Sequence, residues 1–564
     1  MGKSPMTGLL GDSNMGGYFS PELKFAGYDH VLVTGRAEKP VYLWIENDRV
    51  EIRNASEIWG KDTYQTLSAI RRELGNPEVK VLSIGPAGEN LVRFATIQSE
   101  WGNGAGRTGM GAVMGSKNLK AIAVRGTKSI KIANPTEYLA MCKEIDDLIR
   151  NSSAGQELSK YGTTMIMKRM MGRGRYQRNF QFWGQLENQI TPLDIFKKYS
   201  PKKVGCYGCA NRCMEYYEVP GLGSGVISCG IYVGTSIDIE NNNPEVWWQS
   251  ALSCQKQGID ADSVGKILAW AMELYQRGII TTEDTDGIPL EWGDKNAILT
   301  MIQKIAKRDG FGDVLADGMI LGARRIGRGA EEYAMHCKGL PIAENPIGIR
   351  GMSLGIAVGP RGDQYRSYPT IEEGVHDVEC SDAGEEYIEA SKEQAFNEAE
   401  RISGTRKGAD PGSYEGKPAM IIHSERLVAI TDSSGVCKWT TPWYGVQAYT
   451  LEHQAKLLSL GLGKAITLEM FQQIADRIRC LERAFDVDQG LDRSQETLPK
   501  RLFKMKPVAR DAPLDPKKFE EMKSEYYSLR GWDIATGAPT KETLEQLGLG
   551  DVAKDLKKRD KLPA

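Results

Sequence analysis

The sequence has no long uninterrupted apolar run. A membrane-spanning helix needs roughly 18 or more consecutive apolar residues, and no window of this 564-residue chain approaches that length. The N-terminus also lacks the basic, apolar and small-residue pattern of a secretory signal. We therefore expect a cytoplasmic protein without a membrane span.

An excess of charge of one sign is also missing. The 72 basic and 74 acidic residues leave a net charge of −2, whereas a nucleic-acid-binding chain normally shows its basic surface in these totals. The sequence thus predicts no nucleic-acid partner. Because the chain is too long for one ordinary core, we expect several domains with room for a large cofactor.

A dense cysteine framework is absent, since the ten cysteines are dispersed along the chain. Three of them nevertheless stand within eight positions, at Cys206, Cys209 and Cys213. Thiolates with this spacing converge on one centre when the backbone wraps around it, as in loops that hold iron–sulfur clusters. Zinc is the competing interpretation, but structural zinc usually takes ligand pairs from two loops, and the sequence has no second C-x-x-C pair.

A fourth ligand would have to come singly from elsewhere in the chain. Cys437 is the best candidate, because Asp432-Ser-Ser-Gly-Val-Cys437 predicts a short polar turn that can present a thiolate. The alternative for each of these cysteines is a buried, unreactive thiol.

The segment Gly104-Ala-Gly106-Arg-Thr-Gly109 matches the G-x-G-x-x-G dinucleotide pattern, but its surroundings do not. A polar stretch precedes it in place of an apolar strand, and no acid stands where a ribose-binding residue should follow. A nicotinamide site is therefore disfavoured. Together with the glycine-rich segment 11–17, it can still cradle a phosphate-bearing cofactor, and Arg107 suits a phosphate. Ordinary tight turns explain each segment equally well.

The chain changes character near residue 131. Before that point, short runs alternate β-branched or aromatic residues with polar ones and predict strands at 30–35, 41–45, 79–84 and 119–124. Helical periods dominate afterwards, most clearly in 136–150, 244–257, 262–278, 295–309 and 467–486. Residues 361–416 show no lasting period and are predicted to form an excursion or long loop. The sequence predicts an α+β fold.

Taken together, these motifs resemble the aldehyde ferredoxin oxidoreductase family of tungsten enzymes. The similarity is carried by residues 11–29, residues 106–120, the cysteine triplet and the D-x-x-G-x-C turn at 432–437. It implies a tungsten ion, or less often molybdenum, held by two pterin cofactors beside a [4Fe-4S] cluster. It also implies a β-rich pterin-saddle domain at 1–131, N-terminally incomplete relative to the family, and two mainly helical domains at 132–338 and 339–564.

The resemblance assigns roles to individual positions. The positions that match the cluster ligands are Cys206, Cys209, Cys213 and Cys437. Asn14 and Gly104 match the positions whose backbone carbonyls contact a magnesium ion that bridges the pterin phosphates, and Arg107 lies beside them. Those that match pterin-binding motifs are Gly258, Asp260, Asp432 and Gly435. In the first pterin motif, Gln255 stands where the family usually has an acid.

The catalytic positions depart from the aldehyde-oxidising members of the family. Their glutamate after the cysteine triplet is absent from residues 226–230, and their histidine after the R-G motif is replaced in residues 361–365. Asp363 and Tyr365 stand there and can supply a proton. Cys229 falls where a related branch, the tungsten subunit of class II benzoyl-coenzyme A reductase, places a metal-ligating cysteine. A plain buried cysteine is the alternative.

The resemblance therefore implies an oxidoreductase that oxidises an aldehyde, or reduces a related acyl compound. It would exchange electrons with ferredoxin or an iron–sulfur subunit. Two alternatives stay open. One is the catalytic subunit of an aromatic acyl-coenzyme A reductase resembling benzoyl-coenzyme A reductase, and the other is a non-catalytic iron–sulfur electron-transfer subunit. A homo-oligomer or a larger complex is compatible with each.

Overall fold

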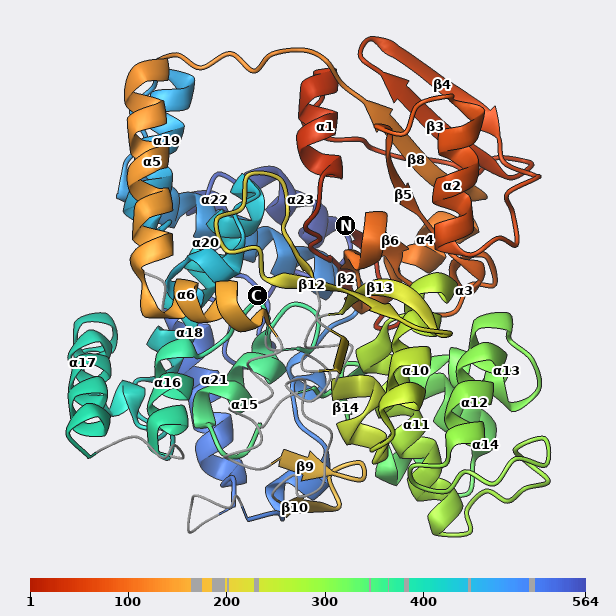
Figure 1. The fold of residues 1–564 in the computed structure, drawn as a ribbon. Helices are drawn as coiled ribbons and strands as arrows, with labels where there is room; N and C mark the ends of the chain where they lie inside the picture. Colours follow the sequence, from red (N-terminus) through yellow and green to blue (C-terminus); the bar gives the residue numbers. More distant parts are fainter. Residues whose placement is uncertain are drawn as a thin grey trace. The chain divides into compact units, whose positions relative to one another are not determined.

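The computed structural model of the chain describes residues 1–163, 175–184, 198–199, 202–227, 233–343, 346–363, 365–379, 385–444, 448–506 and 513–563. The chain divides into two compact units. Figure 1 shows the fold with the chain coloured along its sequence. Unit 1 comprises Met1–Lys131, Glu157–Lys168 and Tyr176–Met335, and unit 2 comprises Ile132–Gln156, Arg169–Arg175 and His336–Ala564. The fold is α+β, as the sequence predicts. The division into three domains remains a prediction.

Unit 1 begins with a six-stranded mixed sheet. Its strands, in spatial order, are β4 (Arg49–Asn54), β3 (Val41–Glu46), β8 (Leu119–Arg125), β5 (Lys80–Ser83), β6 (Ile97–Gln98) and β7 (Gly104–Ala105). β3 and β8 run parallel, and the other neighbouring strands run antiparallel. The strands predicted at 41–45, 79–84 and 119–124 are thus confirmed.

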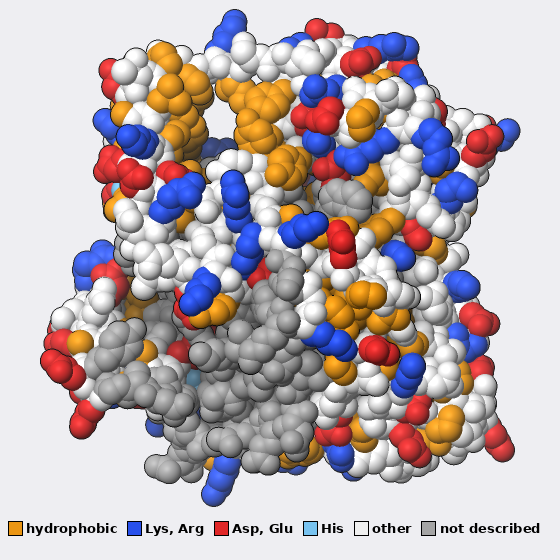
Figure 2. Space-filling view, in the orientation of Figure 1, with side chains coloured by type: hydrophobic (Ala, Val, Ile, Leu, Met, Phe, Trp, Pro, Cys, Tyr) orange, Lys and Arg blue, Asp and Glu red, His pale blue; other side chains and the backbone are white. Residues whose placement is uncertain are grey.

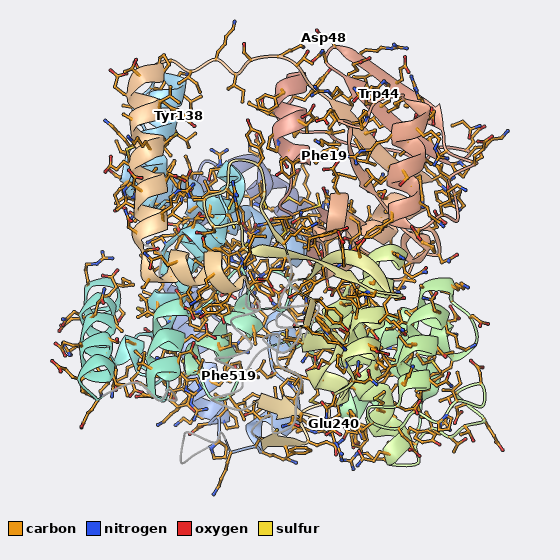
Figure 3. The ribbon with its side chains drawn as sticks, in the orientation of Figure 1. Phe19, Trp44, Asp48, Tyr138, Glu240 and Phe519 are labelled. Atoms are coloured by element: carbon orange, nitrogen blue, oxygen red, sulfur yellow. The ribbon has the colours of Figure 1, made fainter. Side chains whose placement is uncertain are left out.

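Two helices cover opposite faces of this sheet, as Figure 1 shows. α1 (Phe19–Ala26) packs Phe19 into a cluster with Ile45, while α2 (Thr63–Glu73) covers the face that carries Trp44. Neighbouring residues of β3 therefore point to different helices, because side chains alternate along a strand. Figure 3 labels Phe19 and Trp44 in this layered arrangement.

The segment 30–35, predicted as a strand, is a loop in the structure. Val31 and Val33 are half-buried against the sheet, whereas Leu32 between them is 84% exposed. The segment thus has the burial alternation of a strand. Among the described residues no strand pairs with it, and a strand requires such a hydrogen-bonded partner.

The rest of unit 1 is a small sheet followed by helices. The sheet is antiparallel and contains β11 (Lys202–Val204), β12 (Met214–Val219) and β13 (Gly223–Ile227). The helices are α10 (Pro244–Gln257), α11 (Ala261–Gln276), α12 (Lys295–Lys307), α13 (Phe311–Ala316) and α14 (Gly318–Ile326). Shorter elements are β1 (Gly2–Lys3), β2 (Leu10–Gly11), α3 (Pro86–Glu89) and α4 (Met110–Ser116). The predictions at 244–257, 262–278 and 295–309 are confirmed.

Unit 2 is mainly helical. Its central helix, α18 (Lys417–Ser434), packs against α15 (Arg350–Val358), α17 (Glu385–Ser403), α20 (Leu468–Asp488) and α21 (Pro516–Leu529). A second group pairs α5 (Pro135–Asn151) with α19 (Leu451–Leu462). The remaining helices include α16 (Thr370–Glu379), α22 (Lys541–Gln546) and α23 (Gly550–Lys558). Within the described ranges, no helix is long and apolar enough to cross a membrane.

The region 361–416, predicted as an excursion or long loop, contains α16 and α17. Only a narrow stripe of α17 is apolar, and Phe396 and Ala399 from this stripe pack with Val375 and Met420. The other faces of α17 are polar, so the helical period is weak in the sequence. The tertiary contacts supply the burial that stabilises this helix.

Candidate functional site

The two glycine-rich segments of unit 1 lie against each other. The Ser13 hydroxyl donates a hydrogen bond to the Arg107 carbonyl (2.5 Å), and the Thr108 hydroxyl donates one to the Asp12 carbonyl (3.2 Å). Thr108 and Gly109 both adopt left-handed backbone conformations, with φ of 70° and 80°, as the chain turns into α4. The structure therefore brings together the two segments that were predicted to share one cofactor.

Gly104 and Asn14 belong to these segments. Gly104 lies in β7, where an added Cβ atom would stand 2.7 Å from Nε2 of Gln98. Asn14 is exposed on the segment 11–17, which is called the first glycine-rich segment because it comes first in the chain. The buried Gln98 Oε1 and Ser99 Oγ have no hydrogen-bond partner among the described residues. Buried polar atoms are normally paired, so these atoms fit a bound polar group such as a phosphate-bearing cofactor.

The cysteine loop rests on the first glycine-rich segment. It connects β11 to β12 and carries Cys206 at its start. A Cβ atom at Gly16 would stand 2.6 Å from the Cys206 sulfur, and the Tyr207 amide donates a hydrogen bond to the Gly17 carbonyl (3.2 Å). Burial raises the pKa of the Cys206 thiol, and a hydrogen bond with the Gly17 backbone opposes this effect.

The same loop contains a buried polar side chain. Asn211, between Cys209 and Cys213, is 2% exposed, and neither its amide oxygen nor its amide nitrogen has a hydrogen-bond partner within the described part of the chain. Over the same residues, no three His, Cys, Asp or Glu side chains lie close enough together to hold a metal ion. Binding of a metal is coupled to the folding of its ligand loop. A loop with three thiols and a buried amide fits a sulfur-ligated group.

Arg107 lies beside the first predicted pterin motif, which contains Gly258 and Asp260. Its guanidinium is buried and forms an ion pair with Asp262, and a Cβ atom at Gly106 would stand 3.4 Å from the Asp260 carboxylate. Asp260 caps α11 by accepting a hydrogen bond from the Ser263 amide (3.2 Å). Burial raises the pKa of Asp260, the charge of Arg107 opposes this, and the charge of Asp262 adds to it. Asp262 was not predicted as a site residue, although it stands only two positions after Asp260.

Gly258 ends α10 in a left-handed conformation with φ of 68°. Its carbonyl accepts a hydrogen bond from the Thr96 amide (2.8 Å), and a Cβ atom would stand 2.7 Å from the Gly85 nitrogen. Gln255, which replaces the usual acid, accepts a hydrogen bond from the Tyr64 hydroxyl (2.8 Å). The motif is therefore fixed to the sheet region by backbone pairing.

The D-x-x-G-x-C turn lies at the end of α18 in unit 2. Asp432 occupies the last turn of the helix, Gly435 adopts φ of 74°, and the exposed Cys437 follows. Lys438 Nζ lies 3.4 Å from Asp432 Oδ1, and Arg366 Nη1 lies 3.6 Å from Asp432 Oδ2. Two cations thus hold the Asp432 carboxylate.

Asp363 and Tyr365 are linked to this turn through Lys438. Asp363 is 1% exposed and accepts hydrogen bonds from Arg361 Nε (3.0 Å) and from the Tyr365 amide (3.2 Å). Lys438 Nζ donates to the Tyr365 carbonyl (3.5 Å) and so links both predicted proton donors to the predicted pterin motif. Sequence reasoning missed Arg366 and Lys438, although they directly follow Tyr365 and Cys437.

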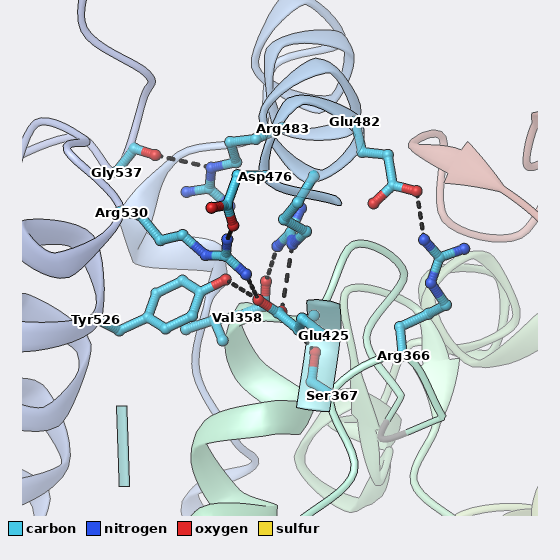
Figure 4. Close-up of polar contacts among 12 residues, drawn as sticks. Val358, Arg366, Ser367, Glu425, Asp476, Glu482, Arg483, Tyr526, Arg530 and Gly537 are labelled. Atoms are coloured by element: carbon cyan, nitrogen blue, oxygen red, sulfur yellow. Dashed lines mark hydrogen bonds and ion pairs between the residues drawn. The ribbon is translucent and has the colours of Figure 1, made fainter. Parts of the chain in front are cut away.

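Arg366 belongs to a group of buried charged side chains, which Figure 4 shows. Arg366 pairs with Glu482 (2.5 Å), and nearby Glu425 pairs with Arg479 (3.3 Å) and Arg530. Burial disfavours the charged form of Glu425, but the two arginines outweigh it and lower the pKa of this carboxyl. The network fixes the position of the loop that carries Asp363 and Tyr365.

The predicted site residues therefore fall into two groups. Unit 1 holds Cys206, Cys209, Cys213, Asn14, Gly104, Arg107, Gly258 and Asp260, and unit 2 holds Asp363, Tyr365, Asp432, Gly435 and Cys437. Cys229 lies outside the described residues, and its role stays a prediction.

Comparison with known protein families gives matches over most of the chain. Residues 1–126 match the family model described as aldehyde ferredoxin oxidoreductase, N-terminal domain. Residues 140–549 match the one described as aldehyde ferredoxin oxidoreductase, domains 2 and 3.

Individual relatives agree with these matches. The chain is 37% identical over 576 residues to a tungsten-containing aldehyde ferredoxin oxidoreductase of Pyrococcus furiosus, and 35% identical over 568 residues to that of Thermococcus kodakarensis. Each alignment covers 97% of this chain and 86% of the relative. A chain in the solved active-site complex BamBC of benzoyl coenzyme A reductase, in complex with 1,5 dienoyl-CoA, is also similar. It superposes with a TM-score of 0.84 at 28% identity, covering 100% of this chain and 87% of that one.

Proposed function

The chain belongs to the aldehyde ferredoxin oxidoreductase family, and we propose that it oxidises an aldehyde and passes the electrons to an iron–sulfur protein. The balanced reaction adds water to the aldehyde and yields a carboxylate, three protons and two electrons. Because iron–sulfur carriers of this kind accept one electron at a time, two carrier molecules are reduced for each aldehyde.

The observation that carries the proposal is the contact between Gly16 and Cys206. It places a loop with three thiols directly against a glycine-rich segment of the kind that cradles phosphates. Arg107 on the second segment and Asp260 beside it add a cation and an acid to the same unit. This combination supports a site for a cluster next to a phosphate-bearing cofactor.

We assign the cofactors to these residues. The proposed ligands of a [4Fe-4S] cluster are Cys206, Cys209, Cys213 and Cys437. The proposed contacts to a tungsten bis-pterin cofactor and its magnesium ion are Asn14, Gly104, Arg107, Gly258, Asp260, Asp432 and Gly435. When bound, these groups supply a two-electron acceptor and an exit for single electrons. Cys229 is proposed to ligate the metal or to lie beside it.

Proton transfer is assigned to Asp363 and Tyr365. Asp363 is almost fully buried, and Arg361 orients its carboxylate. Lys438 holds the Tyr365 backbone next to Asp432. A carboxylate oriented in this way can take up a proton released in the reaction, and the Tyr365 hydroxyl can pass it on.

The test is an anaerobic metal analysis combined with an aldehyde-dependent ferredoxin reduction assay. We expect about one tungsten and about four irons per chain. The Cys209→Ser variant should lose its iron. The control variant, Cys142→Ser, changes a half-buried cysteine on α5 and should retain its iron. Zinc alone, or full iron retention in Cys209→Ser, would contradict the proposal.

A second candidate function is reduction of an aromatic acyl-coenzyme A. The similarity to a chain of the benzoyl coenzyme A reductase complex favours it, as does the position of Cys229. Binding of an aromatic thioester by the purified protein, with no turnover of aldehydes, would support this candidate. Iron without tungsten would instead indicate a non-catalytic electron-transfer subunit.

A further inference from the structure

Basic residues are concentrated around the cysteine loop. Between Asp194 and Glu215 the sequence contains five Lys or Arg residues and no Asp or Glu, in a chain whose net charge is −2. A local excess of one charge in a nearly neutral protein creates a region that attracts molecules of the opposite sign.

The described part of this region exposes cations at the rim of the loop. The Lys202 side chain is 75% exposed, and its Nζ lies 3.6 Å from Oε1 of Glu218, whose side chain is 65% exposed, so solvent weakens this ion pair. Arg212 is exposed in the loop itself. Figure 2 shows Lys and Arg side chains over the loop between β11 and β12.

A helix adds a further cation to this rim. The Ser159 hydroxyl donates a hydrogen bond to the Asn211 carbonyl (2.9 Å), and Lys160, the next residue, is exposed. By contrast, Lys203 is neutralised by the buried Glu215. Among the described residues of the loop and its neighbours, Lys160, Lys202 and Arg212 supply exposed positive charge.

An exposed aromatic side chain lies in the same loop as Arg212. Tyr207, between Cys206 and Cys209, is 54% exposed. Its ring packs edge-on against Phe25 (5.8 Å between centroids) and Tyr18 (6.4 Å), so it is held in place without being covered. A rigid, accessible tyrosine is a frequent centre of a protein–protein interface.

We propose that Tyr207, Lys160, Lys202 and Arg212 form the docking surface for an acidic iron–sulfur electron carrier. The inference rests on the proposed function, because it assumes a cluster in the adjacent cysteine loop. Complementary charge steers an acidic carrier to this part of the surface, and the tyrosine contacts it there. Each docking event moves one electron from the chain to an oxidised carrier, so two events complete the oxidation of one aldehyde.

The test compares two triple variants of the full-length, metal-loaded protein. One replaces Lys160, Lys202 and Arg212 by Glu. The control replaces Lys295, Lys307 and Arg324, exposed cations on the helices of unit 1, by Glu and makes the same change in net charge. The probe is a purified acidic bacterial ferredoxin, whose Kd is measured at low and high ionic strength. Iron content and aldehyde-dependent reduction of a viologen dye are measured in parallel.

We expect the first triple variant to raise the Kd at least about tenfold at low ionic strength and to lose most of its salt dependence. The control should stay within about twofold of the wild type. Tyr207→Ala should raise the Kd about fivefold or more without changing the salt dependence. Iron content and dye reduction should be unchanged in all of them.

The outcomes separate this inference from the proposed function. An unchanged Kd in the first triple variant, with iron and dye reduction intact, overturns the docking surface alone. Absence of iron from the wild type overturns the proposed function and the docking surface with it. If the triple variant loses iron, Lys160→Glu with Lys202→Glu, both outside the loop, should still raise the Kd about threefold. Tighter binding of RNA than of ferredoxin by the same residues also overturns the inference.

Discussion

Gly16 leaves no room for a side chain beside Cys206, because a Cβ atom at this glycine would lie 2.6 Å from the cysteine sulfur. The two residues belong to motifs that are far apart in the sequence. Their contact makes the first glycine-rich segment part of the wall of the cysteine loop. A substitution at Gly16 should therefore affect whatever the loop binds.

Gly16→Ala is expected to lower the iron content of the purified protein. The new methyl group must displace the Cys206 side chain or the first segment, and such overpacking typically costs about 1–3 kcal/mol. Iron per chain and the cluster EPR signal measure the effect. The control is Gly374→Ala in α16, where a Cβ atom meets nothing within 4 Å. Full iron with an unaltered EPR signal in Gly16→Ala would show that the contact is unimportant for the loop.

Gly258→Ala should destabilise unit 1 more than Gly278→Ala. Both glycines have φ of 68°, so both substitutions place a side chain in the left-handed region at a cost of about 1 kcal/mol. At Gly258 the Cβ atom would also stand 2.7 Å from the Gly85 nitrogen, whereas at Gly278 it meets nothing within 4 Å. The steric contact should add about 1–3 kcal/mol. Denaturant unfolding of both variants measures the difference, and equal losses would refute the close approach.

Glu496 should make unit 2 sensitive to acid. The fully buried carboxylate pairs with Arg483 (2.5 Å) and Lys338 (3.4 Å), and although burial opposes its ionisation, these cations lower its pKa to about 2. Its contribution to stability is present above the unfolded-state pKa of about 4.5 and is lost as the pH falls toward 2. Unfolding free energies measured over this range should decrease by roughly 3 kcal/mol through this group.

Glu496→Gln tests the assignment. The variant should lose about 3–5 kcal/mol at neutral pH, because Arg483 and Lys338 remain buried without a counter-charge. It should also show a shallower decrease in stability below pH ~4.5 than the wild type. Glu545→Gln, at an exposed position on α22, serves as the control and should leave both quantities unchanged. An identical acid dependence in wild type and Glu496→Gln would exclude the carboxylate as its source.

Tyr365→Phe is expected to reduce aldehyde turnover about a hundredfold, the effect typical of losing a positioned proton-transfer group. Tungsten and iron content should be unaffected, since the backbone contact between Tyr365 and Lys438 is retained. Tyr414→Phe, which removes a hydroxyl that accepts a hydrogen bond from the Asp515 amide in an exposed region, should keep full turnover. Wild-type turnover in Tyr365→Phe would remove its hydroxyl from the mechanism.

Local patterns predicted the elements whose burial repeats regularly. β3 and α10 follow directly from alternating and helical periods. The same reasoning failed for 30–35 and 361–416. Segment 30–35 has the burial alternation of a strand, but no described strand pairs with it. Segment 361–416 contains the helix α17, whose apolar stripe is narrow. In both, long-range contacts decided the outcome.

The sequence by itself determined the chemistry available to this protein. The spacing of Cys206, Cys209 and Cys213, the glycine-rich segments and the D-x-x-G-x-C turn are readable without coordinates, because thiols and glycines have distinctive chemical and backbone properties. Only the tertiary structure decided which motifs meet. Gly16 contacts Cys206, and Lys438 joins Tyr365 to Asp432, because packing brings together residues whose separation along the chain carries no information about their distance in space.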